Sequence, residues 1–154
     1  LGNQRPKEII NITKEMVIEA RDYLSLAKSD TIDCVALGSP HFSDYECRNL
    51  LSLAGGKQFK VPVYVCTGRH TIAHLQKDHS DRALRELGVV FVVDTCVVVT
   101  PILPKKEGVM MTNSAKFAHY ATGNTGYAPV FGSLADCVKS AQAGVLRWDR
   151  SVWK

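Results

Sequence analysis

The sequence predicts an α/β domain built on an open, mainly parallel sheet that is flanked by helices. Three observations favour this fold class. Short apolar runs alternate with helical patterns, the links between them are short, and polar residues follow nearly every apolar run. With 154 residues, the chain is long enough for one domain with a sizeable single core.

The composition is that of an ordinary globular protein, with 45% hydrophobic and 22% charged residues. The net charge of +4 comes from scattered basic residues, so we expect no nucleic-acid partner, which normally requires a concentrated basic stripe. No apolar run approaches a bilayer span and no signal-peptide pattern is present, so we expect no membrane association and a cytoplasmic location. Five irregularly spaced cysteines favour a reducing compartment over a disulfide framework.

The N-terminal part is predicted to be a polar segment followed by a helix. Residues 1–12 form a linker or a loose terminus in this prediction. Thr13 is a suitable N-cap, because its hydroxyl can accept a hydrogen bond from the first helical turn. A helix over 14–28 is favoured by apolar residues at helical spacing, namely Met16, Val17, Ala20, Leu24 and Ala27.

Strands and helices then alternate. Cys34–Leu37 is a short apolar run that predicts a buried strand ending at a glycine. Ser43 is placed to cap a helix over Asp44–Ala54, which a pair of glycines ends. Val61–Val65 predicts the next strand, and a helical stretch over His70–Leu87 follows it.

The run Val89–Val93 is β-branched and aromatic, which predicts a strand that is buried on both faces. Asp94-Thr95-Cys96 interrupts this run before three more valines, and such polar groups cost burial energy unless each finds a partner. Ligands of parallel sheets gather just past the carboxyl ends of strands, where this triplet is expected. Taken alone, Cys96 is either a small buried hydrophobe or a functional thiol.

The last third of the chain predicts two further strands and two further helices. Pro101–Gly108 is rich in proline, lysine and glycine and predicts a loop, and Gly123–Gly126 predicts another. The predicted elements are a strand over Val109–Met111, a helix over Ala115–Tyr120, a strand over Pro129–Phe131 and a helix over Leu134–Ala143 capped by Ser133. Residues 13–144 are therefore predicted to form the domain, and 145–154 a C-terminal tail.

Polar residues follow the predicted strands and should lie along one edge of a parallel sheet. They are Ser39-Pro40-His41, Thr67-Gly68-Arg69, Asp94-Thr95-Cys96, Asn113-Ser114 and Gly132-Ser133. Helix capping accounts for Ser43, Thr67, Ser114 and Ser133. It does not account for His41, Arg69 or Asp94, and Arg69 either binds a carboxylate or phosphate or forms a surface ion pair.

Other residues have simpler interpretations. His70 and His74 share one helix face but lack the glutamate of a zinc-protease motif, so a solvated face is favoured over a zinc site. The tail carries Trp148 and Trp153 beside Arg147 and Arg150, which indicates that it docks on a surface of the domain. Three cysteines lie within strand or helix patterns and are predicted to be core, namely Cys34, Cys47 and Cys137.

Taken together, the polar segments after the predicted strands form a more specific sequence pattern than any one of them does alone. The blocks are VALGSPHFS (35–43), CTGR (66–69), VVDTCVVVTP (92–101), TNSAKFAHY (112–120) and FGSLADCV (131–138). In this order and spacing they resemble the large-subunit portion of the aconitase X family, over about Asp33 to Gly144. Members are dehydratases related to aconitase, with a large and a small subunit or the two fused. The resemblance implies an aconitase-like, doubly wound domain, and with Leu1 in place of Met it implies a piece of a longer protein.

The resemblance also implies an iron or iron–sulfur cluster, held partly by cysteine and acting as a Lewis acid. Cys96 matches the cysteine of the family's DTC triplet and is the expected metal ligand. Thr67 and Arg69 match a substrate-carboxylate clamp, and the remaining cluster ligands are expected outside this chain.

Further site residues follow from the same resemblance. Asn113, Ser114 and Lys116 are expected to line the pocket, with Lys116 as a catalytic residue. Ser39 stands where some relatives carry cysteine, so it is expected to bind substrate rather than metal. His41 is expected to transfer a proton or donate a hydrogen bond.

The expected partners are the remainder of the large portion, the small subunit or domain, and a small hydroxy-acid substrate. The family acts on cis-3-hydroxy-L-proline in bacterial-type members and on phosphomevalonate in archaeal-type members. The serine before Pro-His and the CTGR block are closer to the hydroxyproline type. The alternatives are a phosphomevalonate dehydratase, or a non-catalytic α/β binding or assembly module that is active only with a partner chain.

Overall fold

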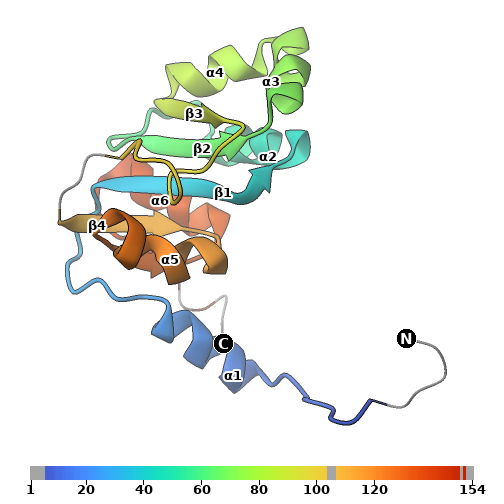
Figure 1. Ribbon diagram of the computed structural model, residues 1–154. Coiled ribbons are helices and arrows are strands. Elements are labelled where there is room, and N and C mark those ends of the chain that lie inside the picture. The colour runs from blue at the N-terminus through green and yellow to red at the C-terminus, as the bar shows by residue number, and fades with distance from the viewer. Residues whose placement is uncertain (1–5, 104–106, 150, 152–154) are drawn as a thin grey trace.

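The computed structural model describes residues 6–103, 107–149 and 151, and these form one five-stranded sheet in the order β3-β2-β1-β4-β5 (Figure 1). All neighbouring strands run parallel, which confirms the predicted sheet. The strands are β1 (Cys34–Phe42), β2 (Val63–Thr67), β3 (Val89–Val93), β4 (Gly108–Thr112) and β5 (Tyr127–Phe131).

Most helices begin where the sequence places a capping hydroxyl. The helices are α1 (Lys14–Tyr23), α2 (Asp44–Ala54), α3 (Arg69–Leu75), the short 3-10 helix η1 (Gln76–Asp78), α4 (Ser80–Glu86), α5 (Ala115–Thr125) and α6 (Leu134–Ala143). The side chains of Thr13, Ser43, Ser114 and Ser133 each accept a hydrogen bond from a backbone N–H of the first turn. None of these helices, within the described ranges, has the length and apolar character that a membrane crossing requires.

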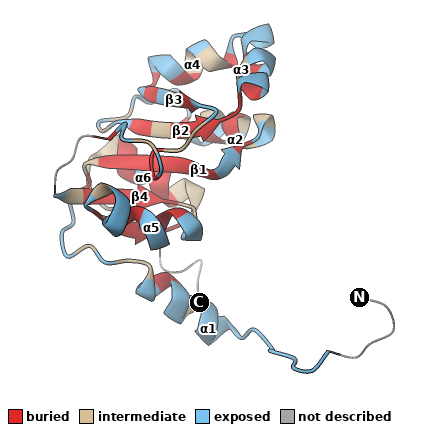
Figure 2. Cartoon of the chain, viewed as in Figure 1, coloured by how far each residue is buried: buried red, intermediate tan, exposed pale blue. Residues whose placement is uncertain are grey.

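The central strands are buried on both faces, which separates the core into two clusters (Figure 2). Val35 and Leu37 of β1 contribute to a cluster with residues of α2, α3, α4 and α6. The alternate residues Cys34 and Ala36 contribute to a second cluster with α5. Helices therefore cover both faces of the sheet, but four helices contribute to the first core cluster and α5 to the second.

A loop completes the second face. The connection from β3 to β4 must return from the sheet edge to the far side of β1, and its described residues form no helix. Val97, Val98 and Leu103 of this loop are buried in the second core cluster. Figure 1 shows the loop lying in front of β1, where a helix would cover the sheet in an ordinary crossover.

Several predictions about the elements are wrong for identifiable reasons. The helix predicted over 14–28 ends at Tyr23, because the segment after it pairs with the sheet edge. The strand predicted to end at Gly38 continues to Phe42, which rejoins β2.

β3 is not buried on both faces, because it is an edge strand in which Val90 is 43% and Val93 is 39% exposed. The helical stretch 70–87 is divided at His79, whose left-handed φ of 63° interrupts it. Residues 123–125 belong to α5 instead of a loop, because the helix continues to a left-handed C-cap at Gly126.

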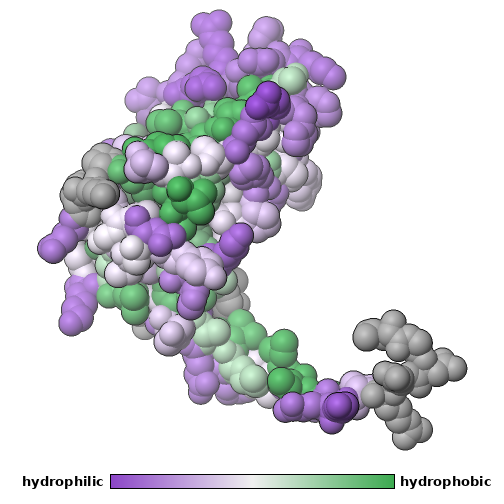
Figure 3. Space-filling view, viewed as in Figure 1, coloured by the Kyte–Doolittle hydropathy of each residue, from purple (hydrophilic) through white to green (hydrophobic). Residues whose placement is uncertain are grey.

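The two ends of the described chain pack differently. α1 ends at Tyr23, and the segment after it pairs with the sheet edge, where Leu26 N–H donates to the Pro129 carbonyl over 2.9 Å. α1 and residues 6–13 before it extend from the sheet with exposed apolar side chains, including Ile9 and Ile12 (Figures 1 and 3). In the tail, Trp148 packs against the core beneath the Arg21 guanidinium, which confirms docking there. The predicted contributions of Arg150 and Trp153 lie outside the described residues.

Gly38 lies where the backbone of β1 passes directly against the Cys66 carbonyl of β2. Its φ is +89°, and a Cβ atom at this position would lie 2.1 Å from the Cys66 carbonyl oxygen. Because no side chain fits this gap, only glycine allows β1 to pass and continue to Phe42, which rejoins β2 opposite Thr67.

We expect Gly38→Ala to lower the free energy of unfolding by about 2–5 kcal/mol, because it adds both a strained φ and an overlap. Urea unfolding of the variant would measure the loss. Gly55→Ala is the matched control, since Gly55 also has a positive φ but its Cβ would meet nothing within 4 Å. The control should lose only about 1–2 kcal/mol, and equal losses at both positions would contradict the steric explanation.

Candidate functional site

The candidate site lies where the strand order changes direction, between β1 and β4. In open parallel sheets, ligands bind in the crevice at this point, beyond the carboxyl ends of the strands. A cavity of about 290 Å³ is found here, and its lining includes Ser39, Asn113, Ser114 and Lys116. These four residues are therefore brought together from two blocks that are far apart in the sequence.

Ser114 joins the two sides of this cavity. Its hydroxyl caps α5 by accepting from the Phe117 N–H over 3.1 Å, and it donates to the Ser39 carbonyl. Ser39 is itself buried, with 8% exposure. The capping prediction for Ser114 is confirmed, and the same hydroxyl fixes the end of β1 against the start of α5.

Two thiols meet beside this cavity. Cys66 of β2 is fully buried, whereas Cys96 of the β3–β4 loop is partly exposed. The pKa of Cys96 is lowered to about 5, mainly by a hydrogen bond from the Cys66 thiol. Hydrogen bonds from the Val98 N–H and the Ser39 hydroxyl, together with the charge of His41, also lower this pKa, whereas burial raises it. The hydrogen bond between the two thiols, together with burial, raises the pKa of Cys66. Cys96 is therefore the more acidic thiol of the pair.

His41 holds the loop from the other side. Its Nε2 lies 3.0 Å from the Thr95 carbonyl oxygen, which can only accept, so Nε2 carries a proton. In a neutral ring Nδ1 is then the atom that can accept a proton. The side chain is exposed at the end of β1, and its role in proton transfer stays a prediction.

Arg69 and Asp94 connect the ends of β2 and β3. Asp94 accepts from the Arg69 backbone N–H over 2.9 Å and from Nε over 2.5 Å. These bonds lower the pKa of Asp94, the backbone bond most. The surface ion pair, one of the two roles that the sequence allows for Arg69, is thus present with Asp94 as the partner. The Arg69 side chain is still 83% exposed. Carboxylate binding by Arg69 stays a prediction.

Thr67 has no exposed surface. Its hydroxyl donates to the Phe42 carbonyl over 2.6 Å, and it does not cap α3, whose N-cap is Gly68. The capping interpretation of Thr67 is therefore wrong. Direct contact of Thr67 with a substrate stays a prediction that its burial does not support.

The other cysteines and histidines have structural explanations. Cys34, Cys47 and Cys137 are buried, as predicted for core residues, and burial raises the pKa of Cys47 to about 12. His70 and His74 are exposed on α3, as predicted for a solvated face.

A metal centre would need donors beyond those described here. In the described part of the chain, no group of three or more histidine, cysteine, aspartate or glutamate side chains could hold a metal ion. Cys96, a partly exposed thiol with a lowered pKa, fits one thiolate ligand of a centre shared with other residues.

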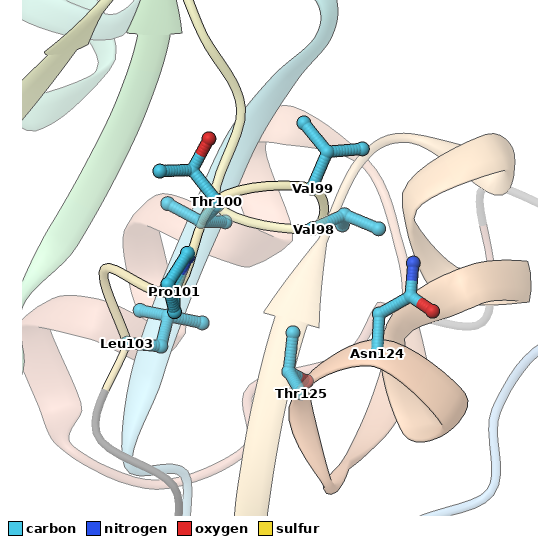
Figure 4. Close-up of a pocket in the computed structure, with 8 residues that line it drawn as sticks. Val98, Val99, Thr100, Pro101, Leu103, Asn124 and Thr125 are labelled. Atoms are coloured by element: carbon cyan, nitrogen blue, oxygen red, sulfur yellow. The ribbon is translucent and has the colours of Figure 1, made fainter.

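A second cavity of about 210 Å³ lies behind the loop that carries Cys96. Figure 4 shows Val98, Pro101 and Leu103 of the loop on one side and Asn124 and Thr125 of α5 on the other. Most of the lining from the loop is apolar. This cavity belongs to the packing of the loop against α5 rather than to the polar site.

Three features of the candidate site were not predicted from the sequence. The pairing of Cys66 with Cys96 has no sequence signal, because it depends on the loop crossing the second face. Glu46 also lines the site cavity, and its hydrogen bond to the Ser43 N–H follows a capping-box pattern that the sequence contains. Asp94 was noted as unexplained by capping, but its pairing with Arg69 was not predicted.

Comparison with solved structures supports the fold. Aconitase X from Thermococcus kodakaraensis, in its holo form, aligns with a TM-score of 0.74 over 86% of this chain and 34% of that chain, at 24% identity. The parallel sheet with helices on both faces thus defines an α/β domain, and its fold matches part of that structure.

Comparison of the sequence identifies the family. The family model described as the aconitase X third domain matches residues 32–143. The cis-3-hydroxy-L-proline dehydratase of Pseudomonas aeruginosa is 34% identical over 93% of this chain, and that of Hypocrea jecorina is 37% identical over 94%. The phosphomevalonate dehydratase large subunit of Methanosarcina mazei is 28% identical over 94%. The chain belongs to the aconitase X family, and it spans about a quarter to a third of the length of these relatives.

We expect Cys96 to be the most reactive cysteine of the chain, because it is ionised above about pH 5 and the other four are buried. Its alkylation by iodoacetamide, followed by mass spectrometry, should keep its rate from pH 8 down to pH 6. In Cys66→Ala the thiol loses its main stabilising donor and its pKa rises, so the rate should already fall below pH 8. An unchanged pH profile in Cys66→Ala would contradict the thiol pairing.

We expect Thr67→Val to lower the free energy of unfolding by about 1–3 kcal/mol, because it leaves the buried Phe42 carbonyl without its donor. Thr67→Ser keeps the hydroxyl and should cost about 1 kcal/mol or less through lost methyl burial. Denaturant unfolding of both variants measures the difference. A Thr67→Val variant as stable as the parent chain would show that this hydrogen bond is unimportant.

Proposed function

We propose that this chain is the third domain of an iron-dependent hydro-lyase that removes water from a small hydroxy acid. The observation that carries the proposal is the position of the Cys96 thiol, which is partly exposed and is hydrogen-bonded to the buried Cys66 and to Ser39 of the switch-point cavity. Membership of a family whose named relatives are dehydratases supports the reaction class. The favoured substrate is cis-3-hydroxy-L-proline, because the relatives of that name are 34–37% identical over 93–94% of this chain, while the phosphomevalonate relatives are 28–33% identical over 72–94%.

Each residue of the site has a proposed role in this reaction. Cys96 would be one ligand of an iron or iron–sulfur centre, which when bound supplies Lewis-acid chemistry at the leaving hydroxyl. Arg69 would bind the substrate carboxylate through its exposed guanidinium. Ser39 and Asn113 would donate or accept hydrogen bonds to the substrate in the cavity.

Proton transfer is proposed for two residues, one on β1 and the other on α5. His41 would act through Nδ1, because Nε2 is held on the Thr95 carbonyl. Lys116 lines the cavity on the first turn of α5, and its ammonium can donate a proton or orient an anion. Ser114 would contribute by fixing Ser39 and by lining the cavity.

The proposed partners are the remainder of the large portion and the small subunit or domain of the same enzyme. The share of each relative that this chain covers supports this, because most of such an enzyme then lies elsewhere. The five free cysteines support a reducing compartment such as the cytoplasm.

The second candidate is a binding or assembly module without activity of its own. The incomplete donor set among the described residues favours it for the isolated chain. Titration of the lone chain with candidate acids, with and without iron, distinguishes the two: binding without turnover is expected here, and turnover by the lone chain would exclude the module.

We expect Cys96→Ala to abolish iron retention in the complete enzyme and to reduce dehydration of cis-3-hydroxy-L-proline at least 100-fold, because a thiolate ligand is lost. Iron is measured by elemental analysis and the rate by product formation, with phosphomevalonate assayed in parallel. Cys47→Ala is the control, since Cys47 is a core thiol of α2. Normal iron content and rate in Cys96→Ala would refute the ligand assignment, and turnover of phosphomevalonate alone would reassign the substrate.

A further inference from the structure

Asp94 adopts a backbone conformation that its residue type disfavours. Its φ is +61°, and among the described non-glycine residues only His79 shares a positive φ. The left-handed region costs an ordinary residue about 1–2 kcal/mol, although aspartate and asparagine enter it more readily than others. Such a conformation persists only where surrounding contacts impose it, and it commonly marks a functional position.

The contacts that impose it lead to the end of β2 and to the first residue of α3. The Asp94 N–H donates to the Thr67 carbonyl over 2.9 Å, which extends the β2–β3 pairing by one bond. Its two carboxylate oxygens accept from Arg69, one from the backbone N–H and the other from Nε. The left-handed turn therefore directs the carboxylate back across the strand ends onto a single residue.

This arrangement determines which part of the Arg69 guanidinium is available. Nε is bound to Asp94 over 2.5 Å, and 83% of the side chain is exposed. An arginine can bind a carboxylate either through Nε and one Nη group or through its two Nη groups. In Arg69 the first mode is partly occupied by Asp94, so the two Nη groups form the pair of donors that remains. A carboxylate can bind such a fork end-on through two parallel hydrogen bonds.

The side-chain part of the pair adds little stability. Ion pairs between exposed side chains contribute about 0–1 kcal/mol, which the left-handed backbone at Asp94 offsets. The bond from the Arg69 backbone N–H secures the start of α3, but it does not involve the guanidinium. A flexible arginine that is free at the surface, in contrast, loses side-chain entropy when it binds an anion, and a preset orientation reduces this loss. The expected benefit of Asp94 is therefore in binding.

We infer that Asp94 is a positioning residue that holds Arg69 with its two Nη groups directed toward the carboxylate of the substrate. The inference rests on the proposed function, in which Arg69 binds that carboxylate. It also connects the two parts of the site, because Asp94 begins the same triplet that ends in Cys96.

The test is steady-state kinetics of the complete enzyme with Asp94→Asn. Asparagine has the same size and tolerates a positive φ, but it lacks the charge that holds Nε. We expect KM to rise about 10-fold, with kcat within about twofold and with iron content and unfolding unchanged. Glu86→Gln is the matched control, because it removes the carboxylate from another exposed ion pair, the one between Arg82 and Glu86 on α4. This variant should leave KM unchanged.

Arg69→Lys and the double variant separate this inference from the proposed function. Arg69→Lys should raise KM, and Asp94→Asn should then add little, because both act through one guanidinium. A raised KM in Arg69→Lys with a normal KM in Asp94→Asn overturns the role of Asp94 and leaves the carboxylate assignment intact. A normal KM in both variants overturns the carboxylate assignment and the inference together. Loss of iron or of kcat in Asp94→Asn, with KM unchanged, also overturns the inference, since Asp94 would then act on the Cys96 loop.

Discussion

The close approach of β1 to β2 at Gly38 is the constraint on which the site depends. The missing side chain lets the β1 backbone pass against the Cys66 carbonyl, and the strand then leaves its regular register before Phe42 rejoins opposite Thr67. The residues in between are released from the ladder and reach the neighbouring segments. Ser39 thereby meets Ser114 of α5, and His41 meets the carbonyl of Thr95.

The second determinant is a crossover in which a loop takes the place of a helix. Because β3 is at one edge and β4 lies beyond β1, the chain must cross the sheet between them, and it does so with an apolar loop. Burial of side chains such as Val97 and Val98 contributes roughly 1.5–3 kcal/mol each. The Asp94-Thr95-Cys96 triplet is therefore anchored by core packing directly after it, which explains why a short polar segment can hold a defined position.

The polar groups that interrupt the Val89–Val99 run are all paired by neighbouring strand ends. Asp94 is paired with Arg69, the Thr95 carbonyl with His41, and Cys96 with Cys66. Pairing removes the desolvation cost that unpaired groups would impose. It also leaves the Cys96 thiol and the Arg69 guanidinium accessible along one edge of the sheet.

The sequence by itself determined the parallel α/β fold, the caps at Ser43, Ser114 and Ser133, and the gathering of polar strand ends along one edge. These features follow from local periodicity and from hydrogen bonds within a few residues, which a single sequence displays. Only the tertiary structure decided that β3 is an edge strand, that Cys66 meets Cys96, and that Asp94 binds Arg69. Each of these depends on the order of strands in the sheet and on the path of one loop across it. That order is set by packing between distant segments, so no local pattern records it.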